Sequence, residues 1–310
     1  IRIEASSGRP WREMGVLLRP PALCEPLISR VFARFGIPVR SYLARRWPQS
    51  AAGRYLVSLV QTIAGGCEWG HVLELMRLPH SGVSLTPEMV RFEYIVLREL
   101  PGEGLERLME LAGPLYPIRR FLERLQHVSR GLTQDLPAER WGQSLQTLSG
   151  LADPGRPRDR LTDEEVLEIR EDLAALDAFP NLLALAVQAA GDDEAAVPLD
   201  RFWSLVEAVA HQTTLRTQDN RRDAVSLLDL FEARQWELPV VFVCGLLEGQ
   251  FPERHPQDLI FDNQDRLALR DAGIHLRTTT DHDAEERLLF DVAATRASEH
   301  LILSYPVIGA

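Results

Sequence analysis

Short apolar runs alternate with amphipathic segments near the start of the chain. Residues 14–19 form an apolar run closed by two prolines, which predicts a buried strand followed by a turn. The preceding residues 1–4 are also strand-like. A helix is predicted over 22–35 and ends at Gly36. Its apolar positions recur every four residues: Leu23, Leu27, Val31 and Phe35.

The middle of the chain carries only helical patterns. Helix starts are marked by Ser50, by Thr86 before a proline, and by the capping box that begins at Thr162. No strand-like alternation interrupts residues 41–218, and the Pro- and Gly-rich segment 150–160 is the best internal linker.

Strand patterns return after about residue 222. Continuous apolar runs at 224–228, 239–245 and 300–305 suit strands covered on both faces. Helices are predicted between them, over 263–272 and 281–297.

These patterns predict an α/β domain with a parallel sheet, interrupted by a large all-helical insertion. The α/β domain takes in residues 1–40 and 219–310, and the insertion residues 41–218. Because two connections join the insertion to its host, we expect a hinged subdomain.

Composition then excludes several chemistries. All 34 basic residues are Arg, so a phosphate-binding P-loop, a PD-(D/E)xK nuclease site and a Schiff-base site, each of which needs a Lys, are incomplete in this chain. The three Cys form no CxxC pair and the eight His no HExxH pair, so no metal site is expected. No apolar run approaches the roughly 18 residues of a membrane span. The chain begins at Ile1 with no signal peptide, which indicates a piece of a larger cytoplasmic protein.

Charge is unevenly distributed along the chain. Residues 1–60 carry ten Arg against three Glu, a net charge of +7, whereas the remaining 250 residues carry a net charge of −18. The N-terminal segment is therefore the candidate phosphate-facing surface, and a solvated basic face is the alternative.

Three segments resemble motifs of UvrD/Rep-type superfamily I DNA helicases. Residues 225–252 resemble the fifth motif and the strand after it, and residues 285–297 resemble the sixth, ending in Thr-Arg-Ala. Residues 15–19 with 36–39 resemble the fourth. The resemblance implies that the α/β part is the second of two RecA-like (P-loop NTPase type) domains and, by position, that the helical part is the family's inserted subdomain.

In such helicases the two RecA-like domains enclose ATP with Mg²⁺, and the second contributes arginines to the cleft. The resemblance assigns this role to Arg19 and Arg296 and places Glu237 near the nucleotide sugar. A planar guanidinium suits phosphate oxygens and charge developing in phosphoryl transfer. The alternatives are a strand-end Arg that satisfies loop carbonyls for Arg19, and a cation at a helix C-terminus for Arg296.

The chain also departs from the motifs of active members. Their Thr-x-His and Lys-Gly-Leu-Glu stand here as Asp229-Leu230-Phe231 and Arg234-Gln235-Trp236-Glu237. The loss of a polar side chain and of a Gly that permits close backbone approach argues against motor coupling. This degeneracy resembles AddB/RexB-type subunits of bacterial helicase–nucleases, in which a helicase-like fold has lost motor function.

Basic and aromatic residues alternate where the insertion begins. Arginines that pair with phosphates and aromatic rings that stack on bases are typical of DNA contacts, and inward packing of the rings is the alternative. The candidate DNA-binding residues are Arg40, Tyr42, Arg45, Arg46, Trp47 and, in the fifth motif, Arg234.

Three functions follow as hypotheses. The first is an inactivated, AddB-like helicase fragment that binds single-stranded or forked DNA and an AddA-like helicase–nuclease subunit in double-strand-break repair. The second is half of an active ATP-dependent translocase, and the third a protein-interaction scaffold without nucleic-acid binding. In each case the fragment alone, without a P-loop, is not expected to be an enzyme or to hold a cofactor.

Overall fold

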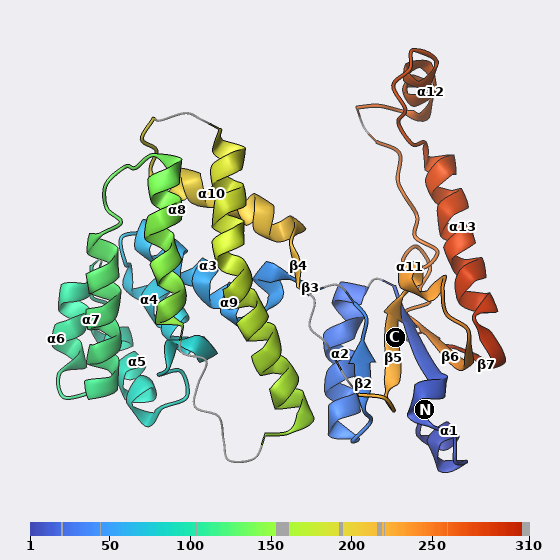
Figure 1. Cartoon of the computed structure of the whole chain (residues 1–310), viewed down its shortest axis with the longest axis horizontal. Helices are drawn as coiled ribbons and strands as arrows, with labels where there is room; N and C mark the ends of the chain where they lie inside the picture. The colour runs from blue at the N-terminus through green and yellow to red at the C-terminus, as the bar shows by residue number, and fades with distance from the viewer. Residues whose placement is uncertain are drawn as a thin grey trace. The chain divides into compact units, whose positions relative to one another are not determined.

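The chain forms two compact units in this computed structural model. One unit comprises Ile1–Leu43 with Asp219–Ala310, and the other comprises Ala44–Gln218 (Figure 1). The structure describes residues 1–19, 21–43, 45–102, 104–152, 161–191, 195–215, 219, 221–258 and 260–305.

The first unit is built on a parallel sheet of five strands in the order β2-β5-β1-β6-β7. The strands are β1 (Met14–Leu18), β2 (Val39–Ser41), β5 (Val225–Asp229), β6 (Leu238–Cys244) and β7 (Ala297–Leu303). All five residues of β1 are buried, which explains why its sequence does not alternate. The chain leaves β1 toward β2 and later crosses to β6, so β1 lies at the point where the strand order reverses.

Helices cover both faces of this sheet. They are α1 (Arg2–Ser6), η1 (Trp11–Glu13), α2 (Pro21–Arg34), α11 (Leu230–Ala233) and α13 (Thr279–Thr295). Helix α12 (Asn263–Asp271) has no buried residue and lies beyond the far end of α13, away from the sheet (Figure 1). One core joins the sheet to α11 and α13 through residues such as Leu17, Leu230 and Leu289. The other core, around Val16, joins the opposite face to α1 and α2. The predicted α/β fold with a parallel sheet is therefore confirmed.

One local prediction at the N-terminus was wrong, because residues 2–6 form the short helix α1 where residues 1–4 are strand-like in sequence. The helix predicted over 22–35 is present as α2, and three residues of its apolar row, Leu27, Val31 and Phe35, are 65%, 49% and 52% exposed. The face against the sheet carries Cys24, Ile28 and Phe32.

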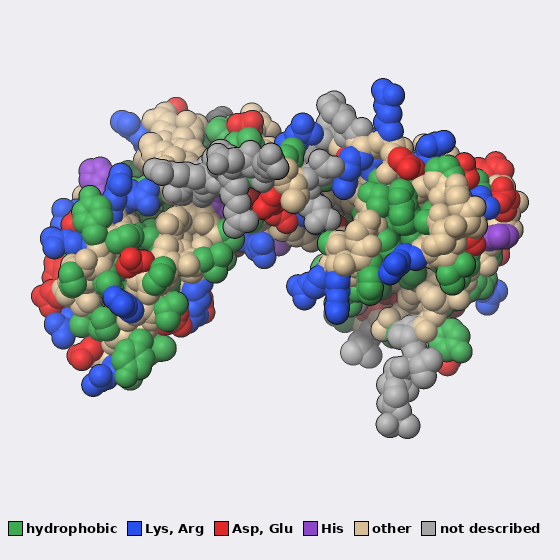
Figure 2. All heavy atoms as spheres, turned by 90° about the horizontal axis from the view of Figure 1, so that it is seen from below, with side chains coloured by type: hydrophobic (Ala, Val, Ile, Leu, Met, Phe, Trp, Pro, Cys, Tyr) green, Lys and Arg blue, Asp and Glu red, His purple; other side chains and the backbone are tan. Residues whose placement is uncertain are grey.

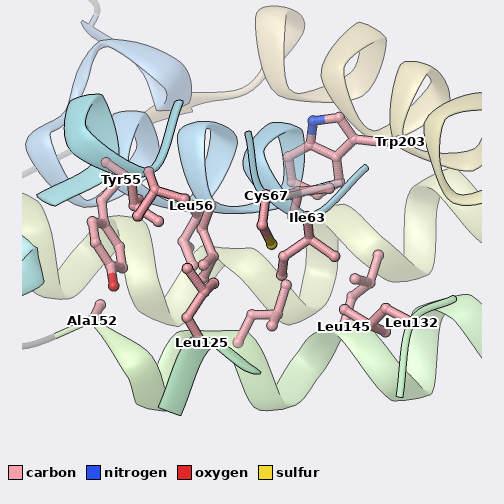
Figure 3. Packing of buried hydrophobic residues seen from close by; sticks show 14 of the residues in the cluster. Tyr55, Leu56, Ile63, Cys67, Leu125, Leu132, Leu145, Ala152 and Trp203 are labelled. Atoms are coloured by element: carbon pink, nitrogen blue, oxygen red, sulfur yellow. The ribbon is translucent and has the colours of Figure 1, made fainter. Parts of the chain in front are cut away.

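The second unit is helical. Its helices are η2 (Trp47–Gln49), α3 (Ala51–Ala64), α4 (Trp69–Arg77), η3 (Pro79–Ser81), α5 (Pro87–Glu99), α6 (Leu105–Ala112), α7 (Tyr116–Arg130), α8 (Ala138–Gln146), η4 (Thr147–Leu151), α9 (Asp163–Ala190) and α10 (Leu199–Gln212). Figure 3 shows one core shared by α3, α7, α8 and α10, with Leu56, Leu125, Leu145 and Trp203 directed into it.

Sequence signals for helix starts in this unit are confirmed. The Ser50 hydroxyl accepts a hydrogen bond from the Gly53 amide, Thr86 caps α5 and Thr162 forms a capping box with Glu165. The prediction of a strand-free segment needs correction, because β3 (Arg45–Arg46) pairs with β4 (Thr214–Leu215) in a two-residue antiparallel ladder. Most of the predicted linker, 153–160, lies outside the described residues.

Helix α9 is long and apolar enough, by length and composition, to cross a membrane. The segment Glu165–Ala190 has a mean hydropathy of 1.5. Its inner residues, including Phe179, Leu182 and Leu183, have no exposed surface and belong to the core of the helical unit. Burial in that core accounts for part of the apolar composition of α9, because 28% of its most apolar window is buried.

Candidate functional site

The fifth-motif loop lies between β5 and β6. Asp229 ends β5 and caps α11, because its carboxylate accepts the Glu232 amide at 2.7 Å. The aromatic ring of Phe231 points outward and is 44% exposed. The Arg234 guanidinium carbon lies 5.2 Å from the centre of that ring, and its Nε donates to the Phe231 carbonyl at 3.2 Å. A cation–π pair between Arg234 and Phe231 therefore lies where active members of the helicase family that the motifs resemble carry a His.

Arg296 lies directly beside this loop, between the C-terminus of α13 and the start of β7. Its Nη1 donates to the Arg234 carbonyl at 3.2 Å, and its Nη2 donates to the Thr295 hydroxyl at 3.1 Å. Its Nε is buried without a hydrogen-bond partner, and no described carboxylate pairs with the guanidinium. A buried donor of this kind has capacity for an anionic acceptor.

Glu237 lies at the same edge of the sheet as Arg296. It precedes β6, whose first residue Leu238 donates to the Arg296 carbonyl at 3.0 Å and pairs with Ala297. Glu237 is exposed and forms no ion pair with a residue in the described ranges. The fold thus brings Glu237, Arg234 and Arg296 together at the amino-terminal edge of β6 and β7.

Arg19 lies at the opposite edge of the sheet. It follows β1, and the pairing of Leu18 with Cys244 places it beside the carboxyl end of β6. Six residue steps of β6, about 20 Å at roughly 3.3 Å each, separate the two edges. The predicted grouping of Arg19 with Glu237 and Arg296 is therefore not found within this unit.

Two glutamates engage the Arg19 side chain. Its Nε donates to Glu286 Oε2 at 3.1 Å, its Nη2 donates to Glu286 Oε1, and Nη2 also lies 3.4 Å from Glu253 Oε2. Glu286 is 3% exposed, and its Oε2 also accepts the Glu253 amide at 3.0 Å. Glu253, His255 and Glu286 form a group that could hold a metal ion by geometry. Because the Arg19 guanidinium already supplies positive charge to both carboxylates, we assign this group a structural role.

A cation and two aromatic rings lie in contact near the carboxyl end of β2. The Arg40 guanidinium carbon lies 4.9 Å from the centre of the Tyr42 ring. The Tyr42 and Trp236 ring centres are 4.8 Å apart at an interplanar angle of 67°. We call Arg40, Tyr42 and Trp236 the aromatic platform. The sequence predicts DNA-binding roles for Arg40 and Tyr42 but not for Trp236, because nothing in the motif shows that its ring reaches β2.

Three of the predicted DNA-binding residues, Arg45, Arg46 and Trp47, lie in the helical unit. Trp47 has no exposed surface, its Nε1 donates to the Ala175 carbonyl at 2.7 Å, and its ring stacks on Phe179. Base stacking on Trp47 is therefore excluded in this fold. Arg45 forms an ion pair with Glu171 at 2.6 Å, and Arg46 Nη1 donates to the His211 carbonyl.

Comparison with known proteins agrees with the sheet and the motifs. Residues 140–307 match the UvrD-like helicase C-terminal domain, which covers the end of the helical unit and strands β5 to β7. The chain is 27% identical to the AddB subunit of the ATP-dependent helicase/deoxyribonuclease of Moorella thermoacetica over 100% of its length, which is 29% of that relative. The corresponding proteins of Desulforudis audaxviator and Pelotomaculum thermopropionicum are 27% and 30% identical over 99% and 97% of the chain.

These matches share one limit of coverage. The chain spans 29%, 29% and 28% of the three relatives, less than a third of each. More than half of the chain matches the family profile itself. The α/β fold with its parallel sheet and helical part is that of a RecA-like helicase C-terminal domain, and the chain belongs to the UvrD-like helicase C-terminal domain family.

Proposed function

We propose that this chain is part of an inactivated, AddB-like helicase that binds DNA and a partner helicase–nuclease subunit during double-strand-break repair in the cytoplasm. In this proposal residues 1–40 and 219–310 form the second RecA-like domain, and residues 41–218 form its inserted subdomain. The family match and the names of the relatives support a place in a helicase–nuclease.

The fifth-motif loop carries the proposal of inactivation. A motor needs a polar side chain in this loop that responds to both DNA and nucleotide, and the ring of Phe231 offers neither a strong donor nor an acceptor. Arg234 is occupied by that ring and by the Phe231 carbonyl. The side chains of this loop therefore contact each other, and none of them is a polar group placed to couple DNA binding to nucleotide hydrolysis.

Any nucleotide contact retained by the intact protein is assigned to the amino-terminal edge of the sheet. Arg296 has the unpaired Nε that an anion would satisfy, and the exposed Glu237 lies beside it. Bound ATP with Mg²⁺ would supply the anionic phosphates. Within this chain Arg296 would donate to them, and Glu237 would accept from a sugar hydroxyl.

DNA contact is assigned to the aromatic platform. Arg40 provides positive charge, while Tyr42 and Trp236 provide rings for single-stranded bases at a fork. Arg45 and Arg46 remain candidate phosphate contacts of the helical unit.

The test is ATP hydrolysis by the full-length subunit with and without single-stranded DNA, accompanied by DNA binding at several salt concentrations. We expect that DNA does not stimulate ATP hydrolysis and that the subunit binds DNA with an affinity that falls as the salt concentration rises. Arg296→Ala is the informative variant, and Arg222→Ala, at an exposed position, is its control. DNA-stimulated hydrolysis that falls by about 10³-fold or more in Arg296→Ala alone would instead identify an active motor.

An active translocase is the second candidate because of Arg296 itself. Arg296 keeps a guanidinium at the motif position and forms no ion pair with a described carboxylate, so its positive charge is available to phosphoryl transfer. The same hydrolysis experiment decides between the two candidates. An intact subunit that binds neither DNA nor nucleotide would leave the scaffold hypothesis.

A further inference from the structure

Helix α5 of the helical unit has two apolar faces. Met89, Phe92 and Val96 are 2% exposed or less and belong to the core. A second apolar row lies on the outside, with exposed fractions between 50% and 96%. We call it the α5 stripe, and it consists of Val90, Tyr94 and Leu97 on the helix with Leu85 and Leu100 just beyond its two ends.

The spacing shows that the α5 stripe is continuous. Val90, Tyr94 and Leu97 follow each other at intervals of four and three residues, so they lie one above the other on a helix. A surface helix in water normally carries polar residues on this face. Figure 2 shows hydrophobic side chains exposed among basic and acidic ones on the surface of the protein.

Two arginines without ion-pair partners among the described residues lie along one side of the α5 stripe. Glu93 is paired with Arg77, and Glu99 lies 3.5 Å from Arg107. Arg91 and Arg98, seven residues apart and so on one side of the helix, form no ion pair with a described residue. Arg98 lies over Tyr94, with 5.9 Å between its guanidinium carbon and the ring centre. One side of the stripe is thus bordered by cations that form no ion pair with a described residue, and the other side by the Glu93–Arg77 pair.

We propose that the α5 stripe is a docking surface for an acidic amphipathic helix of the partner helicase–nuclease subunit. An apolar row on that helix would cover Val90, Tyr94 and Leu97, and carboxylates beside the row would pair with Arg91 and Arg98. Exposed apolar patches bordered by polar residues mark interaction sites, and aromatic and Arg side chains are favoured there. The inference rests on the proposed function only in that a partner subunit exists.

Charge argues against a second copy of this chain as the occupant. In a symmetric antiparallel pair of α5 helices, Arg91 of one copy would approach Arg98 of the other, which places like charges together. An acidic segment removes this repulsion and neutralises both arginines.

The first experiment measures the Kd between the two purified full-length subunits. Val90→Asp combined with Leu97→Asp is expected to weaken binding by about 30-fold or more, because it places charge in the centre of the interface. Leu185→Asp, at a 39% exposed position on α9, is the matched control and should bind normally. Both variants change exposed positions, and equal thermal unfolding midpoints would verify that they fold.

A second variant tests the charge. Arg91→Glu with Arg98→Glu should slow association by about tenfold and flatten its salt dependence, whereas Arg201→Glu on α10 should do neither. Unchanged Kd values in both double variants, with a wild type that binds, would overturn the inference and leave the proposed function standing. A wild-type protein that fails to bind the partner would overturn both.

Crosslinking identifies the occupant. A photo-crosslinking benzoylphenylalanine in place of Tyr94 should attach to an apolar, Asp- and Glu-containing segment of the partner subunit in the purified complex. Attachment to the same chain, to a second copy, to added DNA or to added phosphatidylglycerol vesicles would overturn the assignment.

Discussion

The guanidinium of Arg19 donates to both carboxylate oxygens of Glu286, a residue 267 positions later in the sequence. This contact ties the end of β1 to the middle of α13. The backbones of Arg19 and Gly245 also pack closely. A Cβ at Gly245, whose φ is +84°, would lie 2.8 Å from the Arg19 carbonyl oxygen. The carboxyl edge of the sheet is therefore closed by a residue that the motif resemblance assigned to nucleotide binding.

We expect Arg19 to act through stability. Arg19→Met leaves the buried Glu286 carboxylate without its partner, which should lower the free energy of unfolding by about 3 kcal/mol. Adding Glu286→Leu removes that buried charge and should restore much of the loss. Urea unfolding of the single and double variants measures both effects. A single variant of wild-type stability that loses nucleotide binding would contradict the structural role.

Trp47 is expected to contribute to the core of the helical unit and not to DNA affinity. Trp47→Ala removes a fully buried ring and should cost about 3–5 kcal/mol of unfolding free energy. Under conditions where the variant remains folded, its affinity for single-stranded DNA should match that of the wild type. Arg201→Ala, at an exposed position on α10, serves as the stability control and should unfold like the wild type.

The aromatic platform gives a prediction for DNA binding. Tyr42→Ala should weaken binding of single-stranded DNA by roughly 1–3 kcal/mol if a base stacks there. Arg40→Ala should lower the slope of log K against log salt by about one unit or less. Fluorescence anisotropy of a labelled oligonucleotide measures both. Normal affinity and slope in the two variants would remove the platform from the DNA-binding surface.

The start of α13 should respond to acid. Hydrogen bonds from the amide and hydroxyl of Thr278, with Arg270, lower the pKa of Asp281 from 3.8 to about 2. A carboxyl whose pKa is lower in the folded state stabilises above its unfolded pKa and loses that contribution as the pH falls. Stability should therefore decline between about pH 4 and pH 2, and Asp281→Asn should make that decline shallower. Urea midpoints across this range measure it, with Asp283→Asn as the control.

The order of strands and motifs could be predicted from the sequence, but the edge of the sheet that each residue occupies was overlooked. Arg19 follows a strand, whereas Glu237 and Arg296 precede strands. In a parallel sheet these positions lie at opposite edges, so the signal was present in the predicted elements. A motif comparison assigns residues to a role without asking whether they follow or precede a strand, and so it does not show that Arg19 lies at the opposite edge of the sheet.

Periodicity could not decide which side of α2 meets the sheet. Leu27 and Ile28 each belong to an apolar row with a spacing of four, and only the packing against the strands selects the row of Ile28. Tyr42 and Trp47 show a similar ambiguity, since both stand among arginines and only one is fully buried. Tertiary contacts settle such choices, and a single sequence contains no record of them.

The two-residue ladder between β3 and β4 affects how the sheet can assemble. Strands β2 and β5 pair at Val39 and Val225, 186 positions apart, yet Arg45 and Leu215 are paired within the helical unit. Once that unit has folded, only the twelve positions 42–44 and 216–224 remain to be closed between β2 and β5, in place of the whole intervening chain. At (3/2)RT ln n, this shortening reduces the entropic cost of closure by about 2 kcal/mol. We therefore expect folding to proceed from the inserted unit outward, with β2 joining β5 only after the helices have formed.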